Sequence, residues 1–219
     1  MKKDRIGLLG GTFNPIHEGH IKVAQIAQQR AQLDKILFIP SYEPPHKSSS
    51  DMAPAVHRMA MVKLALEPYP KFEPSSIEIE EKGKSYSIVT LHNINKIYPK
   101  ARIFFIVGVD AFLEIHTWKD YEEVLTQCFF IVVSRPGYCL EDAMNVLNGK
   151  YMKNTYGVSG NEKLDESRLS LYTIFLLPIQ ALDISSSEIR AKIRKGEFIK
   201  NLVSPAVEAY IREYNLYKW

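Results

Sequence analysis

The chain lacks the features that mark secreted and membrane-spanning proteins. Its 219 residues include only two cysteines, Cys128 and Cys139, which provide no disulfide framework and favour a reducing compartment. After the basic start only the four residues IGLL precede the first glycine pair, too few for the apolar region of a signal peptide. Nowhere is an apolar run long enough to cross a bilayer. We therefore expect a cytoplasmic protein.

The chain also lacks a strong charge of either sign. Its net charge of +3 gives no reason to expect nucleic acid or a membrane surface as a partner, so a basic cluster should be local, as at a phosphate site. The hydrophobic share of 46% and the charged share of 24% are typical of globular proteins. A length of 219 residues suits one domain with a substantial core. We expect a single domain, 1–219.

Short apolar runs alternate with helical patterns. The runs are rich in Ile, Val and Phe, as in strands buried on both faces, and they are Ile6–Leu9, Ile36–Ile39, Ile103–Val107, Phe129–Val133 and Thr173–Leu177. The alternating stretch 76–81 predicts an edge or partly exposed strand. Helical spacing begins at Ile21, Val56 and Ile88, and the second of these helices is marked by Val56, Met59, Ala60 and Leu64. This alternation predicts an α/β fold with a Rossmann-like, doubly wound parallel sheet and helices on both faces.

The C-terminal portion, about 184–219, is predicted to be helical. Ser204 suits an N-cap, Pro205 the first helical position, and Val207, Tyr210, Ile211 and Tyr214 follow at helical spacing. Two stretches, 41–54 and much of 134–170, are expected to be loops. The first follows the end of a predicted strand, which is where ligands bind in open α/β sheets.

The stretch GLLGGTFNPIHEGH, residues 7–20, joins the first predicted strand to the first predicted helix. We expect the chain to turn sharply at Gly10 and Gly11 and to leave room there for a ligand. The glycine spacing does not fit the dinucleotide motif G-x-G-x-x-G, and Arg30 stands where that motif needs an acidic residue. HEGH likewise does not fit the zinc motif H-E-x-x-H.

Phosphate binding fits the same stretch better. His17 and His20 share one face of a helix N-terminus, where free N–H groups and the helix dipole attract anions. Gly19 between them would leave room for a sugar or base. The alternative is a capping loop with surface histidines.

The stretch ISSSEIR, residues 184–190, is the second candidate for phosphate binding. Ser185 and Glu188 have the spacing of a capping box, and Arg190 lies about one turn into the predicted helix. An arginine there can make a charge-assisted contact with a phosphate oxygen. By itself the stretch also fits an ordinary capped surface helix.

Together the two stretches resemble a known pair of motifs. GGTFNPIHEGH resembles the signature G-[GS]-[TS/F]-F-D-P-x-H-x-G-H of the nucleotidylyltransferase superfamily, with Asn14 in place of the usual Asp, and ISSSEIR resembles its second motif, I-S-S-[TS]-x-x-R. Four further stretches extend the resemblance nearly end to end to the bacterial nicotinate mononucleotide adenylyltransferases: IPSYEPPHK (39–47), GKSYSIVTL (83–91), FFIVGVDAFLEIHTWKDYEEVL (104–125) and VVSRPGY (132–138).

The resemblance implies transfer of the adenylyl group of ATP to nicotinate mononucleotide in NAD biosynthesis, with Mg²⁺ carried by the ATP phosphates rather than by protein side chains. The implied catalytic residues are His17, His20 and Arg190. The implied ATP-binding residues are Gly10, Gly11, Thr12, Phe13, Gly19, Gly108, Asp110, Ile184, Ser185 and Ser186. Those implied for nicotinate mononucleotide are His46, Lys47, Tyr86, Ser87, Trp118, Lys119 and Arg135.

Some of these roles also have a physical basis in the side chains. Trp118 offers a flat face on which a pyridine ring can stack, and Asp110 can accept from a ribose hydroxyl. His57 and His92 lie within helical patterns and are expected to be structural or solvated.

Three alternatives stay open. The acceptor could be nicotinamide mononucleotide or phosphopantetheine, or the chain could be a nucleotide-sensing regulator without catalytic activity. Small molecules are the expected partners, and a homo-oligomer is compatible with the sequence.

Overall fold

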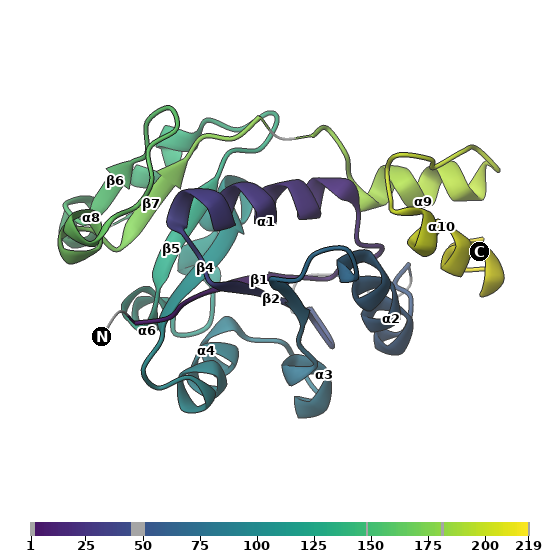
Figure 1. The fold of residues 1–219 in the computed structure, drawn as a ribbon, viewed down its shortest axis with the longest axis horizontal. Coiled ribbons are helices and arrows are strands. Elements are labelled where there is room, and N and C mark those ends of the chain that lie inside the picture. The colour runs from purple at the N-terminus through teal and green to yellow at the C-terminus, as the bar shows by residue number, and fades with distance from the viewer. Residues whose placement is uncertain (1–2, 45–50, 148, 181, 219) are drawn as a thin grey trace. The chain divides into compact units, whose positions relative to one another are not determined.

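The computed structural model describes residues 3–44, 51–147, 149–180 and 182–218. Within these ranges the chain forms an α/β fold with a seven-stranded sheet in the order β3-β2-β1-β4-β5-β7-β6 (Figure 1). The strands are β1 (Arg5–Gly11), β2 (Lys35–Pro40), β3 (Phe72–Pro74), β4 (Arg102–Gly108), β5 (Phe129–Val133), β6 (Thr155–Gly157) and β7 (Ile174–Leu177).

The helices alternate with these strands along the chain. They are α1 (Glu18–Ala31), α2 (Ala55–Leu66), α3 (Ile77–Glu81), α4 (Ser87–Ile97), α5 (Val109–Leu113), α6 (Tyr121–Gln127), α7 (Gly149–Met152), α8 (Glu166–Leu171), α9 (Ser186–Arg194) and α10 (Pro205–Glu213), with two short 3-10 helices, η1 (Ile115–Thr117) and η2 (Leu140–Met144). No helix within the described ranges combines the length and the apolar composition that crossing a membrane requires.

The predicted parallel sheet is confirmed. β1 pairs with β4, β4 with β5, and β7 with both β5 and β6, always in parallel, with Ile6 opposite Ile103 and Phe104 opposite Phe129. The five strands predicted from apolar runs are all present, because continuous apolar runs suit strands that are buried on both faces.

The chain divides into two compact units. The first unit is Met1–Leu9, Val23–Ile36 and Tyr86–Ala181, and the second unit is Gly10–Lys22, Leu37–Ser85 and Leu182–Trp219. In the first unit, α4 and α6 pack on each other on one face of the sheet, and the part of α1 from Val23 onward lies on the other face (Figure 1). Helices on both faces agree with the predicted doubly wound architecture.

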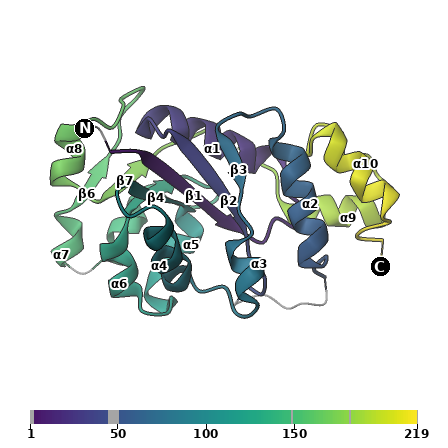
Figure 2. The same cartoon turned by 60° about the horizontal axis from the view of Figure 1, so that its bottom comes forward.

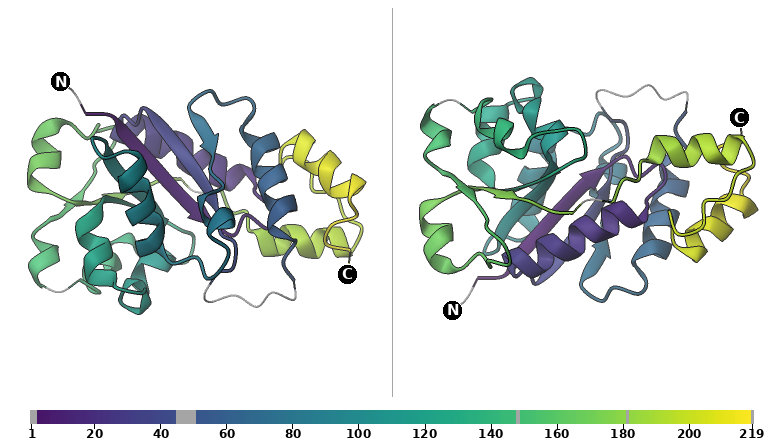
Figure 3. Two further views of the ribbon diagram at one scale, coloured as in Figure 1. Left: turned by 90° about the horizontal axis from the view of Figure 1, so that it is seen from below. Right: turned by 90° about the horizontal axis from the view of Figure 1, so that it is seen from above.

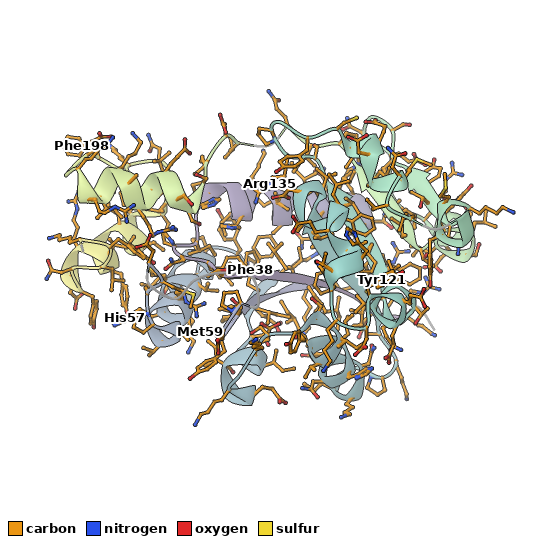
Figure 4. All side chains as sticks on the ribbon, turned by 180° about the vertical axis from the view of Figure 1, so that it is seen from behind. Phe38, His57, Met59, Tyr121, Arg135 and Phe198 are labelled. Carbon is orange, nitrogen blue, oxygen red and sulfur yellow. The ribbon has the colours of Figure 1, made fainter. Side chains whose placement is uncertain are left out.

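In the second unit, α2 packs against β3 and α10, and α9 lies beside them (Figures 2 and 3). The two predicted helix starts are confirmed. The Ser204 hydroxyl accepts from the backbone N–H of Val207 at the start of α10, and Ser185 with Glu188 forms a complete capping box at the start of α9. In the connection between these helices Phe198 points outward and is exposed (Figure 4).

The predicted strand at 76–81 is wrong, because these residues form the helix α3. The alternation of Ile and Glu suggested one buried face, yet α3 buries none of its residues. The backbone N–H of Glu80 donates to the carbonyl of Ser76 at 2.9 Å, and the Ser76 hydroxyl donates to the Glu80 carboxylate. These local bonds favour a helical turn once no apolar face needs to be buried.

The helix predicted from Val56 onward is confirmed as α2. Val56 itself is 68% exposed, and the helix buries Arg58, Met61, Val62, Ala65 and Leu66. Four of these five residues are apolar, and only Arg58 is a type that the sequence would place at the surface.

Much of 134–170 was expected to be a loop, yet it contains η2, α7, β6 and α8. These elements are short and depend on tertiary partners. β6 pairs with β7, and Asp165 caps α8 by accepting from the backbone N–H of Arg168.

Glu166, at the start of α8, accepts hydrogen bonds from Arg102 and Arg5, and these lower the pKa of its carboxyl. The folded state therefore binds this proton less tightly than the unfolded chain does, so the stabilisation is present above the ordinary pKa of 4.5 and is lost as the pH falls below it.

We expect Glu166→Gln to lower Tm by about 1–3 °C at neutral pH, and by less at each step below 4.5. Thermal unfolding across pH measures this. Glu197→Gln, at the exposed pair with Lys192, is the control and should leave Tm unchanged. A Glu166→Gln deficit that does not shrink in acid would contradict the pairing.

Candidate active site

The first motif leaves the sheet later than predicted. β1 continues through Gly10 to Gly11, whose carbonyl accepts from the backbone N–H of Ser41 at 2.9 Å, so the expected sharp turn at the glycine pair is wrong. The change of direction comes at Phe13, which has φ of +48°, and at the cis bond between Asn14 and Pro15. Gly10 is exposed, and no atom of the described residues lies within 4 Å of where its Cβ would be, so the end of the strand is open to a ligand.

The two histidines of the motif lie against each other. The centroids of the His17 and His20 rings are 3.7 Å apart, and His17 is buried while His20 is half-buried. The backbone N–H of His17 donates to Nδ1 of His20 at 3.2 Å. A backbone N–H can only donate, so Nδ1 of His20 accepts, and the neutral ring carries its proton on Nε2. His20 is thereby fixed as a donor through Nε2.

Neighbouring residues hold this pair in place. The Phe13 ring meets His20 edge-on, with centroids 5.0 Å apart. A Cβ on Gly19 would lie 2.9 Å from Nδ1 of His17, so the space predicted for a ligand over Gly19 is occupied by the His17 ring. Gly19 therefore allows the histidines to pack closely, which corrects the expectation that it leaves room for a sugar or base.

The second motif contacts the first within the second unit. Nη1 of Arg190 donates to the carbonyl of Asn14 at 2.9 Å, and the Ser186 hydroxyl donates to the carbonyl of Pro15, also at 2.9 Å. The carbonyl of Ile184 lies 3.8 Å from where a Cβ of Gly19 would be. The N-termini of α1 and α9 therefore belong to one group of residues together with both histidines and Arg190.

Two residues of this group were missed as contacts. The Asn14 side chain donates through Nδ2 to the carbonyl of Asp51 at 2.8 Å, and its Oδ1 accepts from the backbone N–H of Ala53 at 3.0 Å. An aspartate could not make the first of these bonds, so the asparagine at this position has a structural use. Arg58 donates to the carbonyl of Thr12 at 2.8 Å. The sequence does not show that α2 lies beside the first motif, so this contact is visible only in the structure.

In the first unit, Gly108, Asp110 and Arg135 come together where β4 and β5 end. Nε of Arg135 lies 3.4 Å from Oδ1 of Asp110, and Figure 4 marks Arg135 among the side chains of this region. A Cβ on Gly108 would lie 2.3 Å from the same carboxylate oxygen, so the space above Gly108 already holds the Asp110 side chain. Asp110, which is expected to bind ATP, and Arg135, which is expected to bind nicotinate mononucleotide, are thus direct neighbours.

Four further predicted residues belong to the first unit: Tyr86 and Ser87 precede β4, and Trp118 and Lys119 follow it. Trp118 is half-buried and meets Phe105 edge-on at 5.8 Å, so it is not a core residue. Lys119 places Nζ 5.0 Å from the centre of the Tyr86 ring, and Ser87 begins α4. His46 and Lys47 lie outside the described residues.

His57 and His92 have the structural or solvated roles predicted for them. Nδ1 of His57 lies 3.0 Å from the Tyr210 hydroxyl, and Nε2 of His92 lies 2.7 Å from an exposed carboxylate oxygen of Glu123. Across the described ranges, no three His, Cys, Asp or Glu residues are grouped so that they could hold a metal ion.

Comparison with known proteins identifies the family of the chain. The cytidylyltransferase-like family model matches residues 8–192, which include both motifs. A "Probable nicotinate-nucleotide adenylyltransferase" of Pelobacter propionicus is 41% identical over 97% of this chain and 98% of its own length. One of the same description from Clostridium tetani is 39% identical over 100% of both chains.

The fold is also similar to solved structures. The Plasmodium falciparum nicotinic acid mononucleotide adenylyltransferase complexed with NaAD superposes with a TM-score of 0.72 at 22% identity, over 98% of this chain and 97% of that one. At this identity the likeness concerns the fold alone. The family match and the full-length relatives go further: the chain belongs to the cytidylyltransferase-like family, within its group of nicotinate-nucleotide adenylyltransferases.

Proposed function

We propose that this chain, acting as a single domain, transfers the adenylyl group of ATP to nicotinate mononucleotide, giving nicotinate adenine dinucleotide and pyrophosphate. The observation that carries the proposal is the hydrogen bond from Arg190 to the carbonyl of Asn14, because it joins the two phosphate-binding motifs in one group. The activity named for the full-length relatives supports nicotinate mononucleotide as the acceptor.

The proposed reaction is a direct in-line transfer. An oxygen of the 5′-phosphate of nicotinate mononucleotide forms a bond to the α-phosphorus of ATP, and the bond from that phosphorus to the bridging oxygen breaks, so pyrophosphate leaves with the electron pair. The attacking phosphate is already ionised, so no general base is required. The protein positions two anions and stabilises the charge that develops on the phosphate oxygens. Mg²⁺ enters with ATP as part of the substrate, on the phosphate oxygens.

In this proposal the second unit supplies the phosphate contacts. His20 donates through Nε2, His17 supports it, and Arg190 contributes a positive charge. Nε of Arg190 is buried and lacks an acceptor among the described residues, which suits a side chain that shifts to meet a ligand. The remaining proposed ATP contacts are Gly10, Gly11, Thr12, Phe13, Gly108, Asp110, Ile184, Ser185 and Ser186 and, through its backbone N–H, Gly19.

The proposed contacts of nicotinate mononucleotide centre on Trp118. Its ring is held by Phe105 at one edge and is half exposed, which suits stacking of a pyridine ring on its face. Tyr86, Ser87, Lys119, Arg135, His46 and Lys47 are the further proposed contacts, and the cations among them suit an acidic substrate.

We expect Trp118→Ala to raise KM for nicotinate mononucleotide by about tenfold, because one stacking contact of about 1–1.5 kcal/mol is lost. KM for ATP should change much less. Steady-state kinetics with each substrate varied in turn measures both constants. Trp118→Phe keeps an aromatic face and should recover most of the affinity, whereas an unchanged KM in Trp118→Ala would remove this residue from the proposed contacts.

The direct test of the function is pyrophosphate release from ATP and Mg²⁺ with nicotinate mononucleotide, nicotinamide mononucleotide and phosphopantetheine compared side by side. Release mainly with the first supports the proposal. Equal release with the first two would keep the reaction class and remove the preference for the acid, and release only with phosphopantetheine would replace the acceptor. ATP binding without turnover on any of them would favour a regulator.

We further propose a cytoplasmic enzyme whose partners are small molecules. Association of the chain into a homo-oligomer is also proposed, and light scattering at several concentrations tests it.

A further inference from the structure

We infer that Arg58 is a positioning residue, which holds the turn Thr12–Phe13–Asn14 in the shape that orients His20. Arg58 lies on α2, outside both motifs, between His57 and Met59, which Figure 4 labels. The inference rests on the proposed function, because it assigns Arg58 a part in the alignment of a proposed catalytic side chain.

Arg58 is a buried charge whose donors are directed at the backbone. Its side chain is 0% exposed, and burial lowers the pKa of the guanidinium. An arginine stays charged in proteins, and a buried charge is tolerated only when its donors are satisfied. Arg58 donates through Nε to the carbonyl of Ala53 at 2.9 Å, through Nη1 to that of Thr12 at 2.8 Å and through Nη2 to that of Tyr42 at 3.0 Å.

These three carbonyls belong to separate parts of the second unit. Thr12 lies in the first motif, Tyr42 follows β2, and Ala53 precedes α2. The planar guanidinium presents its donors in fixed directions, so it can set the relative positions of the three segments, which the single ammonium group of a lysine cannot do.

The segment held at Thr12 is a strained one. Phe13 is a bulky residue with φ of +48°, in the left-handed region that such side chains rarely adopt, and it is buried. Such a conformation persists only when its surroundings enforce it. Here an arginine holds the carbonyl on each side: Arg58 holds that of Thr12, and Arg190 holds that of Asn14.

The position of Phe13 bears directly on the histidine pair. Its ring meets that of His20 edge-on, with the centroids 5.0 Å apart, and Nδ1 of His20 accepts a hydrogen bond from the backbone N–H of His17. The Asn14 side chain bonds to Asp51 and Ala53, and Arg58 also holds the carbonyl of Ala53. A change at Arg58 is therefore transmitted through backbone contacts to His20.

The test is a double-mutant cycle on kcat. Arg58→Met is expected to lower kcat of the folded enzyme by about 10–100-fold in the native background, because a small misplacement of a catalytic group has effects of this size. In the His20→Ala background the same change should lower kcat by no more than about threefold, since the group that Arg58 positions is already absent. An equal loss in both backgrounds, or an unchanged kcat in the native background, would overturn the inference. If Arg58→Met does not fold, Arg58→Lys carries the same comparison.

Arg5 provides a matched control in the first unit. It is 2% exposed, and it donates to the carbonyls of Ala31 and Leu164 at 2.9 and 2.6 Å and to the carboxylate of Glu166 at 2.8 Å. Arg5→Met should lower Tm as Arg58→Met does, while kcat of the folded fraction stays unchanged. A comparable loss of kcat in Arg5→Met would show that the effect of Arg58 is one of general stability.

A measurement independent of turnover separates this inference from the proposed function. The ¹⁵N shifts of the His20 ring report whether Nδ1 still accepts and Nε2 still carries the proton. Arg58→Met is expected to move these shifts toward the average of the two tautomers, whereas Arg5→Met should not. Unchanged shifts in Arg58→Met overturn the inference. If the ¹⁵N shifts change in Arg58→Met but the native chain is inactive with every acceptor, the positioning role of Arg58 is supported and the proposed function fails.

Discussion

Replacing His20 by alanine is expected to lower kcat by about 10²–10³-fold, with a smaller change in KM for ATP. The reason is that Nε2–H of His20 is a donor fixed in advance by the bond from the His17 backbone to Nδ1. Such a donor stabilises the charge that develops on the phosphate oxygens in the transition state, and it needs no reorientation during the reaction. Steady-state kinetics of pyrophosphate release measures the loss.

Two further substitutions at this position separate the donor from the ring. Glutamine can place its amide nitrogen near the position of Nε2, so His20→Gln should recover about tenfold of the lost kcat. Asparagine can accept from the His17 backbone but is too short to replace Nε2, so His20→Asn should be as slow as His20→Ala. Equal recovery by both amides would contradict a role for the Nε2 donor.

The neutral form of His20 also has a consequence for pH. Nδ1 accepts a hydrogen bond and cannot carry a proton at the same time, so the donor is a neutral ring. We therefore expect kcat to stay constant from about pH 7 to about pH 8.5. If the imidazolium were the active form, kcat would fall over that range as the ring loses its proton. His92→Ala, at an exposed histidine paired with Glu123, is the control and should leave kcat unchanged.

Replacing Arg190 by methionine is the second change with a large expected effect, a loss of about 10²–10³-fold in kcat/KM for ATP. Arg190 holds the carbonyl of Asn14, and we propose that it also binds phosphate oxygens, so the substitution removes a positive charge and loosens the first motif together. Kinetics with ATP as the varied substrate measures the loss.

Lysine at this position distinguishes charge from geometry. A lysine restores the charge but not the fork of donors, so Arg190→Lys should recover less than about tenfold. Arg194, exposed in the last turn of the same helix, provides the control, and Arg194→Met should keep the native kcat/KM. An Arg190→Met enzyme with native kcat/KM would exclude Arg190 from the proposed site.

The sequence by itself determined the fold class and the two motifs. Runs such as Ile103–Val107 and Phe129–Val133 are apolar at every position, and only strands buried on both faces use such runs. The starts of α9 and α10 were also predictable, because a capping side chain acts within three residues of its own position.

Elements without a local signal could not be predicted in this way. The stretch 76–81 alternates like a strand but forms α3, because no buried face requires the alternation. The glycine pair suggested a turn, yet β1 continues through Gly11, and the turn falls at Phe13, a residue that disfavours φ of +48°. Such a conformation depends on contacts made by residues far away in the sequence.

Arg58 shows most clearly what only the tertiary structure decided. By composition an arginine on a helix is expected at the surface, so no local sequence pattern predicts that Arg58 is buried. Its burial is possible because the carbonyls of Thr12, Tyr42 and Ala53 converge on one point from three segments. Local sequence patterns carry the information for strands and helix caps, whereas the convergence of distant backbone groups that stabilises a buried charge exists only in the folded chain.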